Sequence, residues 1–145
     1  MNNAKSASGL LAQAAIRLDT VRKHAKSGNT AYAIRTAQEC AELSLKAVLR
    51  FAGIDYPRRH DTGPVLQTFK ERFPAWFDVD KMSRWNSWLV ERREPSMYGV
   101  EEAGSNPEAL FTRDDALTAL KYSQDIFKSC KRVLLNSKKR KVKKQ

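Results

Sequence analysis

Apolar residues recur every three or four positions along most of this 145-residue chain. That spacing places them on one face of an α-helix, whereas a half-buried strand would alternate apolar and polar residues. The sequence contains no such alternation and no internal repeat. An all-α protein is therefore expected, with four or five amphipathic helices that bury their apolar stripes against one another in an up-and-down bundle.

Two long helices are predicted in the first third of the chain. The first spans about residues 7–26 and stops at a basic turn followed by Gly28 and Asn29, residue types that commonly end a helix. The second spans about residues 30–52 and stops at Gly53. Because so few residues separate the two helices, they are expected to be antiparallel neighbours. The second helix carries an apolar stripe of Ile34, Ala37, Ala41, Leu45, Val48 and Ala52, and a charged stripe of Arg35, Glu39, Glu42, Lys46 and Arg50.

The middle of the chain is predicted to form a loop over residues 56–64 and two shorter helices. Pro74 ends the first of these helices. The second ends at about Arg93, because Pro95 disfavours helix at the residue before it. An irregular segment over about residues 94–111 is expected to follow, since several prolines and glycines interrupt it.

One long helix is predicted in the last third of the chain. Thr112 and Asp115 resemble a capping box at its start, and apolar residues at three-four spacing follow. The helix is expected to end before a disordered basic tail. These boundaries give a helical domain over residues 1–137 and a tail over residues 138–145.

The two cysteines, Cys40 and Cys130, fall at apolar helical positions and share no metal-ligand spacing. Two buried free thiols are expected, because an unpaired cysteine behaves as a small hydrophobic residue; a disulfide between two helices is the alternative. Since zinc-ligand spacing and glycine-rich phosphate loops are both absent from the sequence, neither a metal nor another cofactor is expected.

The positive charge is concentrated at the C-terminal end. Six of the +11 formal charges lie in the tail, and +5 remains on the rest of the chain. Such a cluster can neutralise phosphates of a nucleic acid, whereas the simpler alternative is a solvated tail that aids solubility. The run over residues 138–142 also resembles a nuclear import signal. The tail residues assigned to nucleic-acid binding are Lys138, Lys139, Arg140, Lys141, Lys143 and Lys144.

A cytoplasmic location is expected. The sequence has no apolar run near the roughly 20 residues that a membrane span needs. Residues 1–9 also lack the apolar core of a secretory signal.

Two groups of side chains are candidates for chemistry. His60 precedes Asp61 in a predicted loop, where the carboxylate could orient the imidazole, although loop anchoring is the simpler role. Arg92 and Arg93 precede Tyr98 at a predicted helix end, where guanidinium groups suit phosphate recognition. The alternative is that both arginines pair with carboxylates, namely those of Glu91, Glu94, Glu39 or Glu42.

Three segments together resemble the HEPN family (higher eukaryotes and prokaryotes nucleotide-binding). They are residues 37–49 followed by Gly53, the His60–Asp61 pair, and residues 93–99. The resemblance covers about residues 8–136. It implies a helical bundle that usually dimerises and handles nucleotides or RNA. It also implies a candidate partner, since some members are toxins paired with a minimal nucleotidyltransferase antitoxin.

Active members of the family, by this resemblance, are metal-independent ribonucleases that use an arginine followed, after four to six residues, by a histidine. Their histidine moves a proton at the ribose 2′-hydroxyl, and their arginine stabilises the charge of the phosphorane. The arginine carries over to Arg93, or to Arg92. The histidine does not carry over, because the residue that follows Arg93 after four intervening residues is Tyr98 and no histidine follows His60.

The sequence therefore favours a non-catalytic or catalytically impaired HEPN module. This module is expected to form a homodimer and to belong to a system of toxin–antitoxin type. It would bind a nucleotide, RNA or a nucleotidyltransferase partner. The alternative is a ribonuclease with a non-standard site that uses Arg93 and His60, with Tyr98 as a further catalytic candidate. The residues expected to line the binding groove are Arg92, Arg93, Tyr98, Glu39, Glu42, Lys46, His60 and Asp61.

Overall fold

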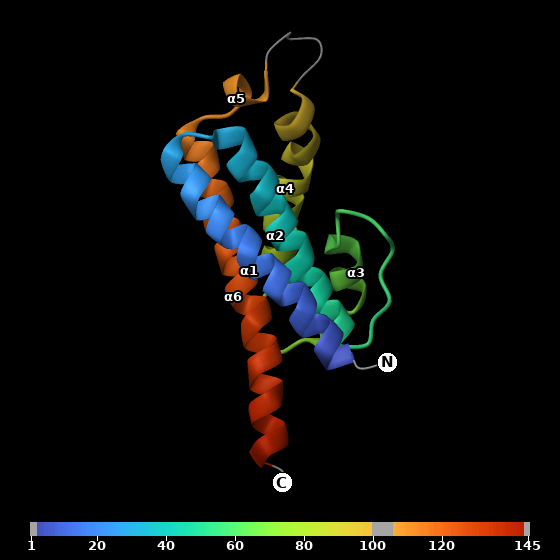
Figure 1. Cartoon of the computed structure of the whole chain (residues 1–145). Coiled ribbons are helices and arrows are strands. Elements are labelled where there is room, and N and C mark those ends of the chain that lie inside the picture. The colour runs from blue at the N-terminus through green and yellow to red at the C-terminus, as the bar shows by residue number, and fades with distance from the viewer. Residues whose placement is uncertain (1–2, 100–105, 144–145) are drawn as a thin grey trace.

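The computed structural model describes the backbone of residues 3–99 and 106–143, and the side chains of residues 3–99 and 106–136. Over these residues all regular elements are helical, which confirms the predicted all-α bundle (Figure 1). None of the described helices is long and apolar enough to cross a membrane. The helices are α1 (Asn3–Ser27), α2 (Thr30–Phe51), α3 (Gly63–Thr68), η1 (Lys70–Arg72), α4 (Val79–Tyr98), α5 (Pro107–Leu110) and α6 (Arg113–Lys143).

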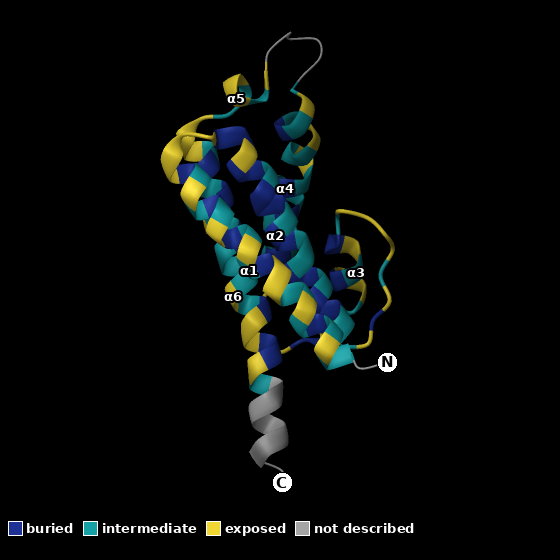
Figure 2. Cartoon of the chain, viewed as in Figure 1, coloured by how far each residue is buried: buried dark blue, intermediate teal, exposed yellow. Residues whose placement is uncertain are grey.

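Helix α2 is the centre of the bundle, because it packs against α1, α4 and α6. Most of its residues are buried, whereas α1 alternates buried and exposed positions (Figure 2). The buried face of α1 comprises Ala7, Ala14, Leu18, Val21 and Ala25. Small side chains reduce the distance at which helices can pack, and those that α2 buries include Ala31, Ala33, Ala37, Ala41 and Ala47. The predicted antiparallel pairing of the first two helices is confirmed.

Helix α4 continues to Tyr98, so the prediction that it ends at about Arg93 is wrong. Pro95 lies in its last turns and removes the hydrogen bond that its own N–H would make. The Ser96 hydroxyl donates to the Arg93 carbonyl at 2.6 Å, which stabilises this turn. The N–H of Gly99 donates to the Pro95 carbonyl at 2.9 Å, and a positive φ of 75° at Gly99 ends the helix.

The predicted irregular segment over residues 94–111 is therefore helical at both ends. Helix α5 begins after Asn106, whose side chain accepts a hydrogen bond from the Ala109 N–H at 3.1 Å. This cap, together with Pro107 in the first turn, favours a helix at that point. Residues 100–105 lie outside the described part of the chain.

Helix α6 begins at the predicted capping box. The Thr112 N–H donates to Asp115 Oδ2 at 2.9 Å, and the Asp115 N–H donates to Thr112 Oγ1 at 3.1 Å. The helix runs on to Lys143, so the prediction that it ends before the basic tail is wrong. Lysine and arginine are good helix formers, and neither glycine nor proline interrupts this segment. The tail side chains lie outside the described residues, and disorder of the tail stays a prediction.

Both cysteines are free and buried, as predicted. Burial raises the pKa of the Cys40 thiol to about 12. Burial also raises the pKa of the Cys130 thiol well above its ordinary value. Both thiols are therefore protonated and unreactive at neutral pH, and they act as core residues.

The central position of α2 predicts a large cost for shortening its core side chains. Leu45 is fully buried, so Leu45→Ala is expected to lower the free energy of unfolding by about 2–5 kcal/mol. Leu117, which is 41% exposed on α6, is the matched control, and Leu117→Ala is expected to cost less than about 1 kcal/mol. Urea denaturation followed by circular dichroism measures both values. Equal losses in the two variants would contradict the packing described for α2.

Candidate functional site

A continuous hydrogen-bonded chain of side chains joins α2, the end of α4 and the loop before α3. Arg93 Nη1 donates to Gln38 Oε1 at 2.6 Å, and Gln38 Nε2 donates to Glu42 Oε1 at 3.0 Å. Glu42 Oε1 lies 2.7 Å from His60 Nδ1. Glu42 Oε2 accepts from Lys46 Nζ at 2.9 Å. We call these five residues the Glu42 network, because that carboxylate connects three of its members.

Local structure explains why these side chains meet. Gln38, Glu42 and Lys46 are spaced four residues apart on α2, so they lie above one another on one helix face. The last turns of α4, which continue past the predicted end, hold Arg93 against this face. His60 arrives on the loop that precedes α3.

Asp61 fixes the loop that carries His60. Its Oδ1 accepts hydrogen bonds from the Gly63 N–H at 2.9 Å and from Asn86 Nδ2 at 3.1 Å. Asn86 is fully buried in α4, so the loop is anchored to the body of the bundle. Asp61 therefore has the anchoring role that the sequence offered as the simpler possibility, and the carboxylate bound to the imidazole is that of Glu42.

Burial and charge fix the state of the central carboxylate. Burial by itself would raise the pKa of Glu42, but hydrogen bonds from Gln38, Lys46 and His60 outweigh it and hold that pKa below its ordinary value. An ionised carboxylate can only accept hydrogen bonds, so His60 must carry a proton on Nδ1. In the neutral imidazole, Nε2 is then the acceptor. The His60 side chain is 54% exposed, against 16% for Glu42, so the ring reaches solvent while its partner stays covered.

His60 and Arg93 both line two neighbouring hollows. The first, of about 390 Å³, has a largely apolar wall of Val90, Met97 and the Tyr98 side chain, with Glu94 at its edge. The second, of about 180 Å³, is more polar and is completed by Arg17, Glu39, Glu42 and Leu43. The first hollow thus offers an apolar wall, and the second offers the guanidinium groups of Arg17 and Arg93.

The structure brings together most of the residues that the sequence predicted for the site. Glu42, Lys46, His60 and Arg93 belong to the network, and Glu39 and Tyr98 line the hollows. Tyr98 is 72% exposed.

Arg92 lies apart from these residues. Its Nη1 donates to the Trp88 carbonyl at 2.9 Å, and its guanidinium carbon lies 3.8 Å from the centre of the Trp88 ring. Arg92 Nη1 lies 3.7 Å from Glu91 Oε2, so the pair between Arg92 and Glu91, one of the carboxylate pairs offered as the alternative, is formed. Arg93 instead bonds to the amide of Gln38.

Sequence reasoning missed two residues of the site, Gln38 and Arg17. Gln38 had a detectable signal, because this polar residue stands at three-four spacing between Ile34 and Ala41 on the apolar stripe. Arg17 had none, since its place beside the second hollow follows from how α1 packs on α2.

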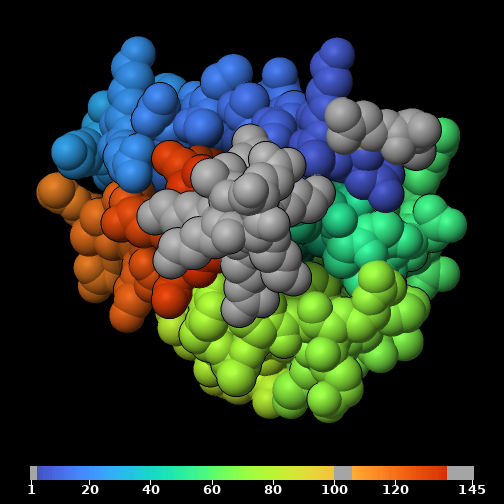
Figure 3. Space-filling model, turned by 90° about the horizontal axis from the view of Figure 1, so that it is seen from below, coloured from blue at the N-terminus to red at the C-terminus, as the bar shows by residue number. Residues whose placement is uncertain are grey.

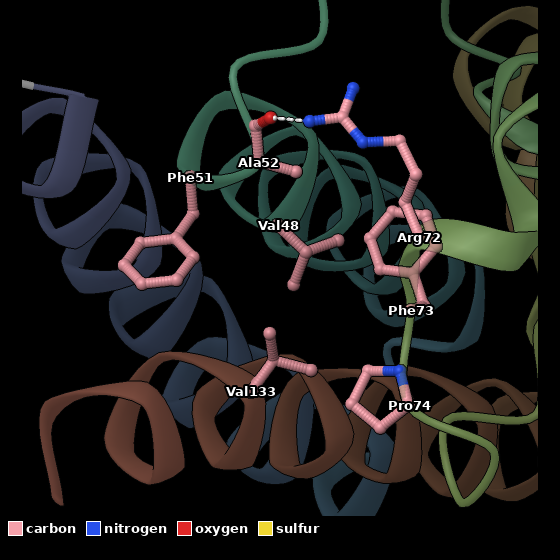
Figure 4. Close-up of a pocket in the computed structure, with 7 residues that line it drawn as sticks. All are labelled: Val48, Phe51, Ala52, Arg72, Phe73, Pro74 and Val133. Carbon is pink, nitrogen blue, oxygen red and sulfur yellow. Dashed lines mark hydrogen bonds between the residues drawn. The ribbon is translucent and has the colours of Figure 1, made fainter. Parts of the chain in front are cut away.

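A third hollow, of about 400 Å³, lies at the C-terminal end of α2 and shares no residue with the network. It is mostly apolar and opens between α2, the segment after η1 and α6 (Figure 4); Figure 3 views this end of the molecule. The Arg72 guanidinium stands at its edge and donates to the Ala52 carbonyl. The lining residues are Val48, Phe51, Ala52, Arg72, Phe73, Pro74 and Val133.

Potential metal ligands are dispersed. Among the residues whose side chains are described, no group of three or more histidines, cysteines and carboxylates could hold a metal ion.

The lowered pKa of Glu42 predicts a pH-dependent contribution to stability. A carboxyl group whose pKa is lower in the folded state stabilises the fold above its unfolded value, near 4.5, and that contribution disappears as pH falls through the folded value. Glu42→Gln is therefore expected to be less stable than the natural chain at pH 7, with the difference shrinking below about pH 4.5. Urea denaturation over a pH series measures it.

Glu91→Gln is the control for this series, because the Glu91 side chain is 70% exposed. Its stability is expected to stay within about 0.5 kcal/mol of the natural chain at neutral pH. A difference between Glu42→Gln and the natural chain that grows toward acidic pH would show that the carboxylate is not stabilised by its partners.

Comparison with known proteins identifies the family. The HEPN domain family matches the chain over residues 7–133. No curated protein matches it.

Two solved structures are similar to the chain. TT1696 from Thermus thermophilus is 25% identical, with a TM-score of 0.72 over 91% of this chain and 98% of that one. The archaeal HEPN homologue ST0689 is 21% identical and has the same fold, with a TM-score of 0.69 over 92% of this chain and 99% of that one. The family match spans most of the described bundle and confirms the resemblance seen in the sequence. This chain belongs to the HEPN family.

Proposed function

We propose that this HEPN protein binds RNA or a nucleotide, with the phosphate bound at Arg93 and His60. The observation that supports the proposal is that these two side chains line the same two hollows, although they come from different segments. The Arg93 guanidinium donates to Gln38 through Nη1, and its remaining N–H groups can donate to a phosphate oxygen.

The two hollows differ in a way that suits the two parts of a nucleotide. The Tyr98 and Met97 side chains give the larger hollow an apolar wall against which a base can stack. Arg17 and Arg93 give the smaller hollow two guanidinium groups near the phosphate. Lys46 neutralises Glu42 and so reduces its repulsion of the ligand's charge.

A second candidate function is metal-independent cleavage of RNA, favoured by one observation. Glu42 holds His60 through Nδ1, which leaves Nε2, on a side chain that is 54% exposed, to accept a proton. In this reaction Nε2 takes the proton of the ribose 2′-hydroxyl, the 2′-oxygen attacks phosphorus, and the 5′-oxygen leaves and is protonated by water. Arg93 would stabilise the charge that develops on the phosphoryl oxygens.

The predicted partners belong to the same proposal. A homodimer and a minimal nucleotidyltransferase partner in a system of toxin–antitoxin type are expected from family membership. The exposed Tyr98 at the end of α4 is accessible to a partner protein. The basic tail over residues 138–145 would add affinity for RNA that depends strongly on salt.

Substituting Arg93 is expected to weaken RNA binding. Removing a charged hydrogen-bonding group is worth about 1.5–3 kcal/mol, so Arg93→Ala should weaken binding about 10- to 100-fold. Deleting residues 138–145 should also weaken binding and flatten its salt dependence. Fluorescence anisotropy of a labelled single-stranded RNA at low salt measures both.

Arg113→Ala is the matched control, because Arg113 is exposed at the start of α6 and lies outside both hollows. It removes the same charge and is expected to change binding less than threefold, which corresponds to about 0.6 kcal/mol. Circular dichroism checks that each variant is folded. Absence of binding by all forms of the protein, or equal effects of the two arginine variants, would refute the proposed site.

Substituting each of the two histidines of the chain tests whether the protein cleaves RNA through His60. In the presence of a chelator, His60→Ala is expected to abolish cleavage of single-stranded RNA, because Nε2 is lost. His24 is the control, since its Nδ1 contacts Asn29 Nδ2 at 2.9 Å at the end of α1, and His24→Ala should cleave normally. Cleavage that survives His60→Ala, or no cleavage by the natural chain, would eliminate this second function and leave the binding proposal standing.

A further inference from the structure

A cluster of aromatic rings lies between α4 and α6, away from the Glu42 network. The Trp85 and Tyr122 rings are stacked, with centroids 4.7 Å apart and planes at 11°. The Trp88 ring packs edge-on against Tyr122 at 5.4 Å. All three rings are only partly buried at the edge of the core, so each leaves some surface to solvent.

Cations cover the rings of this cluster. Lys81 Nζ lies 4.6 Å from the centre of the Trp85 ring, and Lys121 Nζ lies 5.8 Å from it. The Arg92 guanidinium lies 3.8 Å from the centre of the Trp88 ring. We call these six residues, Lys81, Trp85, Trp88, Arg92, Lys121 and Tyr122, the α4–α6 face.

The positive charge on this face is largely unneutralised. Within the part of the chain whose side chains are described, neither Lys81 nor Lys121 has an acid within ion-pair distance, and Arg92 has only Glu91 at 3.7 Å. Residues 81–92 and 121–132 together contain seven basic residues and two acidic ones, Glu91 and Asp125. A surface of this kind attracts a polyanion.

We propose that the α4–α6 face binds single-stranded RNA, with bases stacked on the indole rings and phosphates bound by Lys81, Lys121 and Arg92. Partly exposed rings alternating with cations are the arrangement by which single strands are held without sequence preference, because every base has a face that can stack. A ring–cation contact at an exposed site is weak, so the cations can move from the rings to the phosphates at small cost.

This surface is separate from the proposed phosphate site at Arg93. None of its six residues lines either hollow of the Glu42 network.

On α6 the basic stretch from Lys121 to Arg132 is about 16 Å long at 1.5 Å per residue. That length matches about five stacked nucleotides at 3.4 Å each.

The three tryptophans of the chain provide a direct signal, because two of them, Trp85 and Trp88, lie on this face. An unlabelled oligouridylate of ten nucleotides, added at low salt, is expected to quench the tryptophan fluorescence. In Lys81→Ala/Lys121→Ala, which loses two cations proposed to contact phosphates, binding should weaken about tenfold. The slope of the binding constant against salt, on logarithmic axes, should fall by about 1.4, since each single-strand phosphate contact contributes about 0.7.

Matched variants separate this surface from general charge and from the other site. Lys23→Ala/Lys26→Ala removes two exposed lysines from α1 and should retain the quenching and the affinity. Lys81→Arg/Lys121→Arg keeps the charges and should restore binding. Arg93→Ala should keep the full quenching at saturating RNA, so failure of the proposed phosphate site and failure of the α4–α6 face are distinguishable.

Two results would overturn the proposal. One is quenching that is absent, or a binding constant measured by quenching that is the same for Lys81→Ala/Lys121→Ala as for the natural chain. The other concerns Trp88→Leu studied by analytical ultracentrifugation: if it converts a dimer to a monomer while RNA affinity is unchanged, the α4–α6 face is an interface between copies of the chain.

Discussion

Gln38 is fully buried in α2, and a buried amide destabilises a protein unless its donor and its acceptor are both bonded. Gln38 meets this requirement with Arg93 on one side and Glu42 on the other. Glu42 in turn needs hydrogen-bond donors because it is mostly covered, and Lys46 and His60 supply them. One unfavourable burial is thus relieved by a chain of contacts that fixes the end of α4 and the loop before α3.

The position of α2 gives this chain of contacts its rigidity. The helix packs against α1, α4 and α6, so its side chains have little freedom to move. A site supported by such a helix can hold an imidazole and a guanidinium at the same hollow. The same packing brings Arg17 of α1 to the second hollow. This chain has no histidine after its candidate arginine, Arg93. His60, which lies on an earlier loop, instead supplies an imidazole to the hollows that Arg93 lines.

Much of the fold could be predicted from the sequence, because helix formation depends on local periodicity and on caps. The stripe through Leu45 predicted a buried second helix, and the spacing of Thr112 and Asp115 predicted the start of α6. The ends of α4 and α6 were predicted too early, because neither Pro95 nor the charge of the basic tail stops these helices. Pro95 is accommodated because Ser96 and Gly99 supply other hydrogen bonds.

The site was harder to predict, because its members come from segments that meet only in the folded bundle. Sequence reasoning selected Glu42, His60 and Arg93 by chemical type and by family resemblance. The position of Gln38 on the apolar stripe signals a buried amide, but the sequence could not show which groups it joins, since Arg93 is distant in sequence. Sequence reasoning also grouped Arg92 with Arg93, although adjacent helical residues point in directions about 100° apart at 3.6 residues per turn. Arg92 therefore lies over Trp88 on the α4–α6 face.

In the proposed function, Arg93 and His60 act on one ligand at the two hollows that both residues line. A double-mutant cycle on RNA binding tests it directly, using Arg93→Ala, His60→Ala and the double variant under conditions that prevent cleavage. The structure predicts a coupling energy of at least about 0.5 kcal/mol between the two substitutions, as expected for residues that share a partner. Strictly additive effects, of the kind expected for His60→Ala combined with the remote Arg113→Ala, would contradict the claim.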